Sequence, residues 1–215
     1  MNTNRKSVEF STLLAFTVLA LEVGCGAPAV PAKVANGPDA TPAVSKPNLI
    51  GEWESACTKN GDTVLRLSFD IGADDWKLDY ATFADAECKV PFLTVRIEGD
   101  YQVTEQAAQA SPGWEGRFGF TRKSTKAHMQ AASDFLASPK GCGAGVFPVG
   151  AEVDVGKDGC AGLGQRPIAS CKQDFDLVFQ EGDTLAFGER PADNDLCTKE
   201  KRPTKKAGLE MTRRR

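Results

Sequence analysis

The chain has 215 residues, of which 41% are hydrophobic and 26% charged, with a net charge of −3 and an isoelectric point near 5.4. This length accommodates one domain together with processing segments, and the hydrophobic share is sufficient for a buried core. Nucleic-acid binders usually carry a basic stripe, so an acidic chain argues against a nucleic-acid partner. Basic residues cluster only between Lys199 and Arg215, where we expect a solvated tail or, alternatively, contact with anionic lipid head groups.

Residues 1–24 have the features of a signal peptide. Arg5 and Lys6 are followed by an apolar run from Phe10 to Leu21. That run is too short to span a hydrocarbon core, which needs about 20 residues. The sequence therefore predicts an exported protein from which this segment is removed.

Cys25 follows the small residue Gly24, as at the cleavage site of a bacterial lipoprotein, although Glu22 stands where leucine is usual. We expect Cys25 to be lipidated with acyl chains such as palmitate, and the protein to be held at a membrane by them. The alternative is ordinary signal cleavage nearby, which would give a secreted or periplasmic protein. Gly26 is not the aspartate that often retains lipoproteins at an inner membrane, so an outer-membrane lipoprotein of a bacterial cell envelope is favoured.

Residues 25–47 combine the lipidated cysteine with a stretch rich in alanine and proline. Such a stretch has too few large apolar side chains to offset the entropy of ordering, so a flexible tether is expected. Residues 48–215 then form the β-domain. No second folded domain is predicted.

The β-domain is predicted from apolar residues that alternate with polar ones, a pattern typical of antiparallel strands with one buried face. Leu65, Leu67 and Phe69 alternate with Arg66 and Ser68. Further strands are expected over 51–57, 76–80, 93–103, 114–122, 149–155, 175–180, 184–188 and 209–212. Turn sequences such as Asn60-Gly61 and Glu181-Gly182-Asp183 separate neighbouring strands.

Residues 126–137 break this pattern, because Met129, Ala132, Phe135 and Leu136 have helical spacing. A short helix that includes His128 is expected there. The fold class is therefore all-β with a minor α part: about eight antiparallel strands in a closed barrel or a strongly curved sheet. Closure removes exposed sheet edges, and a two-sheet sandwich is the alternative.

Six cysteines remain once Cys25 is set aside, and an even set in an exported chain predicts three disulfides. They are Cys57, Cys88, Cys142, Cys160, Cys171 and Cys197. Strand direction brings Cys57 and Cys88 to the same end of the sheet, so we expect them to pair. For the rest we favour Cys142 with Cys160 and Cys171 with Cys197, although six cysteines allow fifteen connectivities.

A motif in the first strands resembles a known family. Gly51-x-Trp53-x-Ser55-x-Cys57, followed by Trp76 and by Asp85-x-x-Cys88-x-x-Pro91, is similar to the repeat of the vertebrate membrane glycoproteins named for being down-regulated by adenomatosis polyposis coli. It also resembles small bacterial lipoproteins with a lipocalin-like module. The family's usual Tyr-Tyr-Ala-Asp is Thr82-Phe83-Ala84-Asp85 here. The resemblance covers about 50 residues, implies a lipocalin-like barrel that binds acyl chains, and pairs Cys57 with Cys88.

No catalytic, metal or cofactor site is predicted. His128 is the only histidine, no G-x-S-x-G elbow is present, and the cysteines lack zinc-binding spacing. We therefore expect a protein that is not an enzyme. His128 should be exposed or locally hydrogen-bonded.

Aromatic residues on the alternating faces are the candidate ligand-binding residues, namely Trp76, Tyr80, Phe118 and Phe120, with Phe175, Phe179 and Phe187 on similar faces. The first hypothesis is a membrane-tethered envelope lipoprotein that binds an apolar or amphipathic small molecule inside the barrel. The alternative is a solid-cored structural or macromolecular interaction module of the cell envelope, whose loops bind a partner. An internal cavity of several hundred Å³ would favour the first.

Overall fold

The computed structural model describes residues 45–143 and 145–215. Within them the chain forms eleven strands, one α-helix and two short 3₁₀ helices. They are β1 (Gly51–Ser55), β2 (Thr58–Asn60), β3 (Thr63–Ile71), β4 (Asp75–Phe83), β5 (Pro91–Gln106), β6 (Trp114–Gly119), β7 (Arg122–Ala127), α1 (Gln130–Leu136), β8 (Glu152–Asp154), η1 (Ala161–Leu163), β9 (Gln173–Glu181), β10 (Thr184–Gly188), η2 (Lys199–Lys201) and β11 (Lys206–Arg213).

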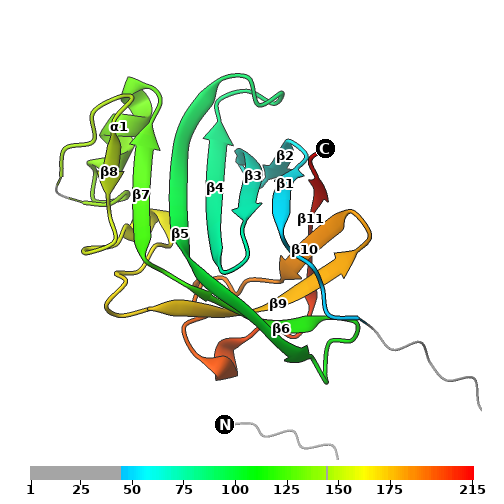
Figure 1. Cartoon of the computed structure of the whole chain (residues 1–215). Helices are drawn as coiled ribbons and strands as arrows, with labels where there is room; N and C mark the ends of the chain where they lie inside the picture. The colour runs from blue at the N-terminus through cyan, green and yellow to red at the C-terminus, as the bar shows by residue number, and fades with distance from the viewer. Residues whose placement is uncertain (1–44, 144) are drawn as a thin grey trace, which may run out of the picture. The chain divides into compact units, whose positions relative to one another are not determined.

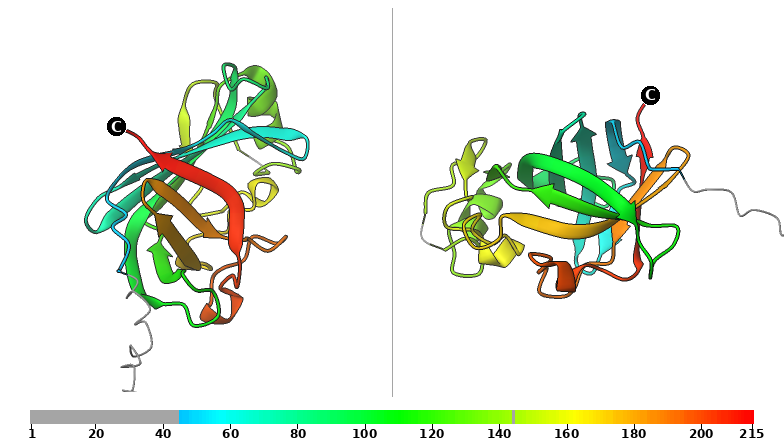
Figure 2. Two further views of the ribbon diagram at one scale, coloured as in Figure 1. Left: turned by 90° about the vertical axis from the view of Figure 1, so that its right-hand side faces the viewer. Right: turned by 60° about the horizontal axis from the view of Figure 1, so that its bottom comes forward.

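Eight strands close an antiparallel barrel, as the alternating pattern predicts. The hydrogen-bonded circuit runs β1–β3–β4–β5–β6–β9–β10–β11 and returns to β1. β2 adds to the edge of β3, and β7 with β8 adds to β5 outside the circuit. Figure 1 shows the circuit, and Figure 2 shows its closure through β11 in two further views.

β5 is the longest strand, and two different strands pair with it along the same edge. Its first part, Leu93 to Glu98, pairs with β7, and its second part, from Tyr101 onward, pairs with β6. The two parts meet at Gly99, where the backbone of Gly119 crosses so closely that a Cβ on Gly99 would lie 1.9 Å from the Gly119 carbonyl oxygen. Only glycine fits at this crossing.

The single strand expected over 114–122 is in fact two strands. β6 ends at Gly119 because the chain turns away from β9 there: the Phe120 amide donates to the Lys172 carbonyl, and the Thr121 amide already donates to Glu98 on β5. β7 then continues to Ala127, which pairs with Leu93. This prediction of one continuous strand was wrong.

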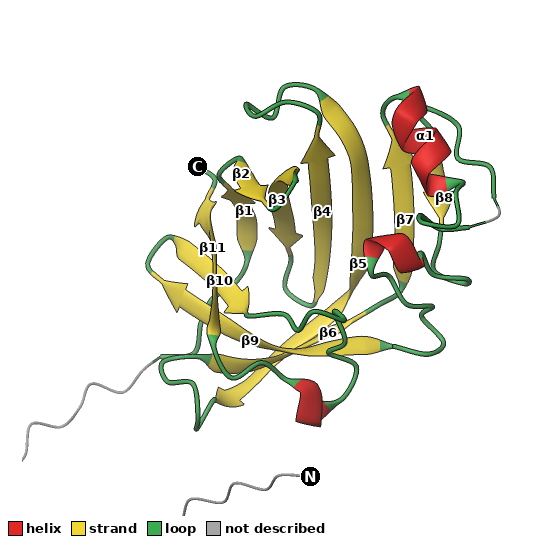
Figure 3. Cartoon of the chain, turned by 180° about the vertical axis from the view of Figure 1, so that it is seen from behind, coloured by secondary structure: helices red, strands yellow, loops and turns green. Residues whose placement is uncertain are grey.

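The predicted helix is present but shorter than 126–137. Residues 126 and 127 belong to β7, so α1 begins at Gln130. Ala132 and Leu136 are its buried residues, and α1 packs against β7 and β5 (Figure 3). His128 therefore lies in the turn before the helix and not on it. The strand expected over 149–155 is reduced to the three residues of β8.

The barrel core follows the predicted alternation. Phe69, Trp76, Phe118 and Phe187 form a connected aromatic cluster, with ring centroids 4.9 to 5.9 Å apart. Leu93, Val95 and Ile97 on β5 are buried beside them. On the outer face, Arg96 forms a two-pronged ion pair with Asp79, with both oxygens at 2.7 Å.

The three disulfides have the predicted pairings: Cys57–Cys88, Cys142–Cys160 and Cys171–Cys197. Disulfides persist in oxidising compartments, so they indicate that the domain folds after export. Among helices of the described residues, none has both the length and the apolar character needed to cross a membrane.

Candidate ligand-binding cavity

The barrel interior is open and holds a cavity of about 1020 Å³. Inward-facing side chains of the strands form most of its surface. They include Leu65, Leu67, Leu78, Tyr80, Val95 and Met211. The cavity is at the upper end of the 300–1,000 Å³ that small-molecule sites typically offer.

All four aromatic residues that the sequence singled out line this cavity. Trp76, Phe118 and Phe120 belong to the buried core, and Tyr80 is partly buried. The Trp76 indole donates to the Gly119 carbonyl at 3.1 Å, which fixes the ring plane. Burial raises the pKa of the Tyr80 hydroxyl above its ordinary value, so that group is neutral in the cavity.

β9 reverses the expected facing of its residues. Asp174 and Asp176 line the cavity, whereas Phe175 and Phe179 do not. Phe175 packs beneath the guanidinium of Arg202, whose carbon is 5.6 Å from the ring centroid. The prediction that these two phenylalanines share the faces of the cavity aromatics was wrong, because in β9 the residues that line the cavity are the two aspartates, which alternate with the phenylalanines.

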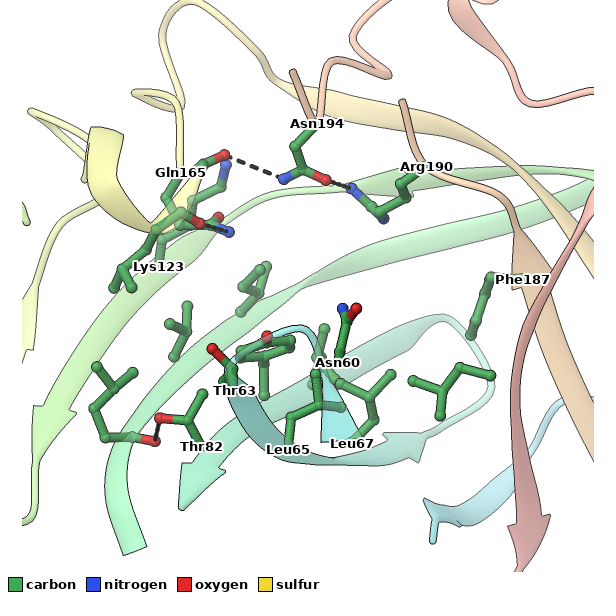
Figure 4. A pocket seen from close by; sticks show the side chains of 18 of the residues that line it. Asn60, Thr63, Leu65, Leu67, Thr82, Lys123, Gln165, Phe187, Arg190 and Asn194 are labelled. Carbon is green, nitrogen blue, oxygen red and sulfur yellow. Dashed lines mark hydrogen bonds between the residues drawn. The ribbon is translucent and has the colours of Figure 1, made fainter. Parts of the chain in front are cut away.

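A group of polar side chains, here called the polar wall, lies across the cavity from β3 and β4. It consists of Lys123, Gln165, Arg166, Asp174, Asp176, Arg190 and Asn194. In Figure 4, Lys123, Gln165, Arg190 and Asn194 stand on one side, and Leu65, Leu67 and Thr82 stand on the other. The cavity is therefore amphipathic.

Arg190 is the centre of the polar wall. It donates to Asp174 Oδ2 at 2.6 Å and to Asn194 Oδ1 at 2.8 Å, and it lies 3.6 Å from Asp176 Oδ2. Asp176 Oδ1 accepts from the backbone amides of Leu177 and Gly188. The Asp176 carboxylate is thus held by backbone amides of the barrel as well as by Arg190, whereas Asp174 is held by Arg190.

Burial raises the pKa of Asp176 to about 6, against the opposing influence of Arg190. Burial also lowers the pKa of Lys123 to about 8. The Lys123 ammonium donates to the Arg166 carbonyl at 3.2 Å and lies 3.9 Å from the centroid of the Phe120 ring. Perturbed titratable groups gathered in one cavity are typical of functional sites.

The polar wall was not predicted from the sequence. The four residues that dominate it, Lys123, Asp174, Asp176 and Arg190, come from β7, from β9 and from the segment after β10. The available signal was the pair of aspartates two residues apart in an otherwise apolar strand, which period-two spacing places on one face.

His128 lies outside the barrel cavity, as a locally hydrogen-bonded residue. Its Nε2 is 2.9 Å from the Thr94 hydroxyl, in a small depression that also includes Glu152. Burial lowers its pKa, with Lys126 contributing. Cys171, Asp174 and Cys197 are the described residues whose spacing would suit a metal, but the two sulfurs are bonded to each other.

Cys25, the predicted lipidation site, lies outside the described residues. In comparisons with known proteins, no family model matches the chain and no curated protein shows significant similarity to it.

Proposed function

We propose that this protein is an exported binding protein that holds an amphipathic small molecule inside its barrel. The observation that carries the proposal is the cavity of about 1020 Å³ with an apolar wall opposite a polar one. A solid-cored module would have this interior filled by side chains. Rigid strands on most sides make the cavity pre-formed, as is usual for small-molecule sites.

The sequence extends this proposal to the membrane. A lipidated Cys25, followed by the tether, would hold the barrel at the surface of a cell-envelope membrane, close to the source of amphipathic ligands. The resemblance to lipocalin-like bacterial lipoproteins supports the same assignment. We propose a binding role in place of catalysis.

Ligand binding is tested with Nile red, a neutral dye that fluoresces in apolar surroundings. The dye should bind the purified protein, and Leu67→Trp, which fills the cavity, should weaken binding by about tenfold or more. Ser68→Gln is the matched control, because residue 68 alternates with 67 and does not line the cavity. Unchanged binding in Leu67→Trp would contradict the proposal. Native mass spectrometry then identifies a co-purified ligand.

The membrane tether is tested separately by expressing the full chain in a bacterial host. Wild-type protein should fractionate with membranes and carry the added mass of acyl chains, and Cys25→Ser should lose both. If Cys25→Ser remains in the membrane fraction with an unchanged mass, the anchor is not at this residue.

A further inference from the structure

We propose that the cavity's ligand carries an anionic head group, which Arg190 and Lys123 bind on the polar wall while the apolar tail lies against β3 and β4. This inference rests on the proposed binding function and assigns the chemical class of its ligand. The inference rests on a comparison of the cationic and the acidic side chains of the polar wall: how exposed each is, and which hydrogen bonds it already makes.

The two arginines of the polar wall are more exposed than the carboxylates with which they pair. The Arg190 side chain is 43% exposed, whereas those of its partners Asp174 and Asp176 are 9% and 3% exposed. Arg166 repeats the arrangement, since it is 44% exposed and its partner Asp195 is 8% exposed. At the polar wall, a ligand therefore meets guanidinium N–H groups more readily than the oxygens of their paired carboxylates.

The carboxylates are also committed to other donors. Asp176 Oδ1 already accepts from two backbone amides, at 2.7 and 3.0 Å, and Asp174 Oδ2 accepts from Arg190. A cationic head group would compete with Arg190 for Asp174 Oδ2 and with two backbone amides for Asp176 Oδ1. An anionic head group needs no displacement, because a guanidinium has five N–H donors in a planar fork that suits carboxylates and phosphates.

Lys123 provides a second reason for an anion. Its residue is only 3% exposed, and among the described residues no carboxylate lies within 4.0 Å of its ammonium group. Its hydrogen-bond acceptor is the neutral Arg166 carbonyl. A buried ammonium without an ion-pair partner is electrostatically unfavourable, and an anion in the adjoining cavity would compensate it.

The opposite wall suits an alkyl or aromatic tail. Leu65, Leu67, Leu78 and Val95 line it, and the residues of the aromatic cluster line the same cavity. A tail there removes apolar surface from water, and the head then lies across the cavity at the cations. Tail and head thus have separate binding surfaces.

The test uses the purified full-length protein loaded with Nile red and displaces the dye with three amphiphiles that share one alkyl chain: laurate, dodecanol and dodecylamine, all below their micellar concentrations. Laurate should displace the dye at about tenfold lower concentration than dodecanol, which corresponds to one charge-assisted contact. Dodecylamine should be the weakest. If laurate and dodecanol are equal, or dodecylamine is strongest, the inference is wrong while the binding function stands. If Nile red and all three amphiphiles fail to bind, the proposed function itself fails, and the inference falls with it.

Variants then locate the head group. Lys123→Gln and Arg190→Gln should each reduce the laurate preference severalfold. Lys126→Gln, on the same strand but on its outer face, and Arg117→Gln, paired with Asp100 outside the cavity, are matched controls. Arg190→Gln leaves two carboxylates without their cation, so circular dichroism checks its folding, and Lys123→Gln decides the question if Arg190→Gln does not fold. A wild-type preference in folded Lys123→Gln and Arg190→Gln would overturn the assignment.

Discussion

Arg213 lies against the face of Trp53, with the guanidinium carbon 4.1 Å from the indole centroid. The first and last strands of the barrel meet at this pair, because residues 53 and 213 are register partners in β1 and β11. Arg213 also donates to the carbonyls of Ile50 and Asn48, while the Trp53 indole donates to Leu49 at 2.7 Å. The contact therefore fastens the segment that enters the barrel to the strand that closes it.

Arg213→Ala should lower the free energy of unfolding by about 1–3 kcal/mol, since it removes a cation–π contact and two charge-assisted hydrogen bonds. Urea unfolding followed by tryptophan fluorescence measures the change. Arg214→Ala is the neighbouring control: its ion pairs are long, at 3.8 and 3.9 Å, and exposed, so less than about 0.5 kcal/mol is expected. Equal losses in the two variants would show that the Trp53 contact contributes nothing.

The facing of β3 predicts unequal effects at three consecutive residues. Phe69→Ala should cost about 3–5 kcal/mol, because Phe69 packs against both Trp76 and Phe187. Leu67→Ala should cost less, about 1–2 kcal/mol, because Leu67 borders open cavity and is only half-buried. Ser68→Ala, on the outer face, should cost under about 0.5 kcal/mol. The same denaturant titration tests all three, and equal effects at the three residues would contradict this facing of β3.

Removing the Cys57–Cys88 bridge with a double alanine variant should lower the free energy of unfolding by about 3–4 kcal/mol. The two cysteines are 31 residues apart, and cross-linking such a loop restricts the unfolded chain by that amount in the chain-entropy model. Differential denaturant unfolding of oxidised wild type and the double variant measures it. A loss below about 1 kcal/mol would mean that strain of the bridge in the native state offsets its restriction of the unfolded chain.

Asp176→Asn should have an effect on stability that depends on pH. Because the folded-state pKa of Asp176 is raised to about 6, the native protein binds more protons than the unfolded chain between the two pKa values, so Asp176 lowers stability as pH rises through this window. From about pH 4.5 to about pH 7 the loss should be roughly 2 kcal/mol. Asp176→Asn lacks this titration, so its free energy of unfolding should rise relative to that of wild type by the same amount over this pH range. Parallel pH profiles of unfolding free energy would contradict the assignment.

Binding of laurate should weaken from about pH 7 to about pH 9.5, because the pKa of Lys123 is lowered to about 8 and its charge is lost as pH rises through that value. Asp174, Arg190 and Arg166 also face this group, and Asp176, with a pKa of about 6, is already ionised when the titration begins. Nile red displacement should show a fall of several-fold in wild type. Lys123→Gln should show a flat profile over this range, and a wild-type fall in that variant would assign the titration to another group.

Much of the barrel can be predicted from local patterns. Alternation in β3, β4 and β5 correctly places Phe69, Trp76 and Val95 inside, because on these strands one face is apolar and the other wet. The pairing of Cys57 with Cys88 follows from strand direction, because the antiparallel order brings both residues to the same end of the sheet. The division between β6 and β7 could not be predicted, because it depends on a change of partner strand. Both strands pair with β5, but β6 also pairs with β9, whereas β7 pairs with β8.

The candidate site could be predicted only in its apolar half. Trp76 and Tyr80 are recognisable because aromatic residues in phase with a buried face border the interior. Asp174 and Asp176 are not, because an acidic side chain in phase with the interior is tolerated only when a cation arrives from elsewhere. That cation is Arg190. Its position depends on the path of the chain after β10, which the local spacing of apolar and polar residues does not predict.

Two of the disulfides bear on how ready the cavity is to receive a ligand. Cys160 directly precedes η1, and Cys197 follows the stretch that carries Arg190 and Asn194, so both bridges secure the irregular segments of the polar wall. The polar-wall residues on β7 and β9 are held by the hydrogen bonds of the sheet, whereas those on the irregular segments are held by disulfides. A loop that is already held in place loses little further entropy when a ligand binds. The head-group contacts are therefore preorganised only while the Cys142–Cys160 and Cys171–Cys197 disulfides are intact. Opening these two bridges would free the segments that carry the polar wall, so the head group should bind more weakly.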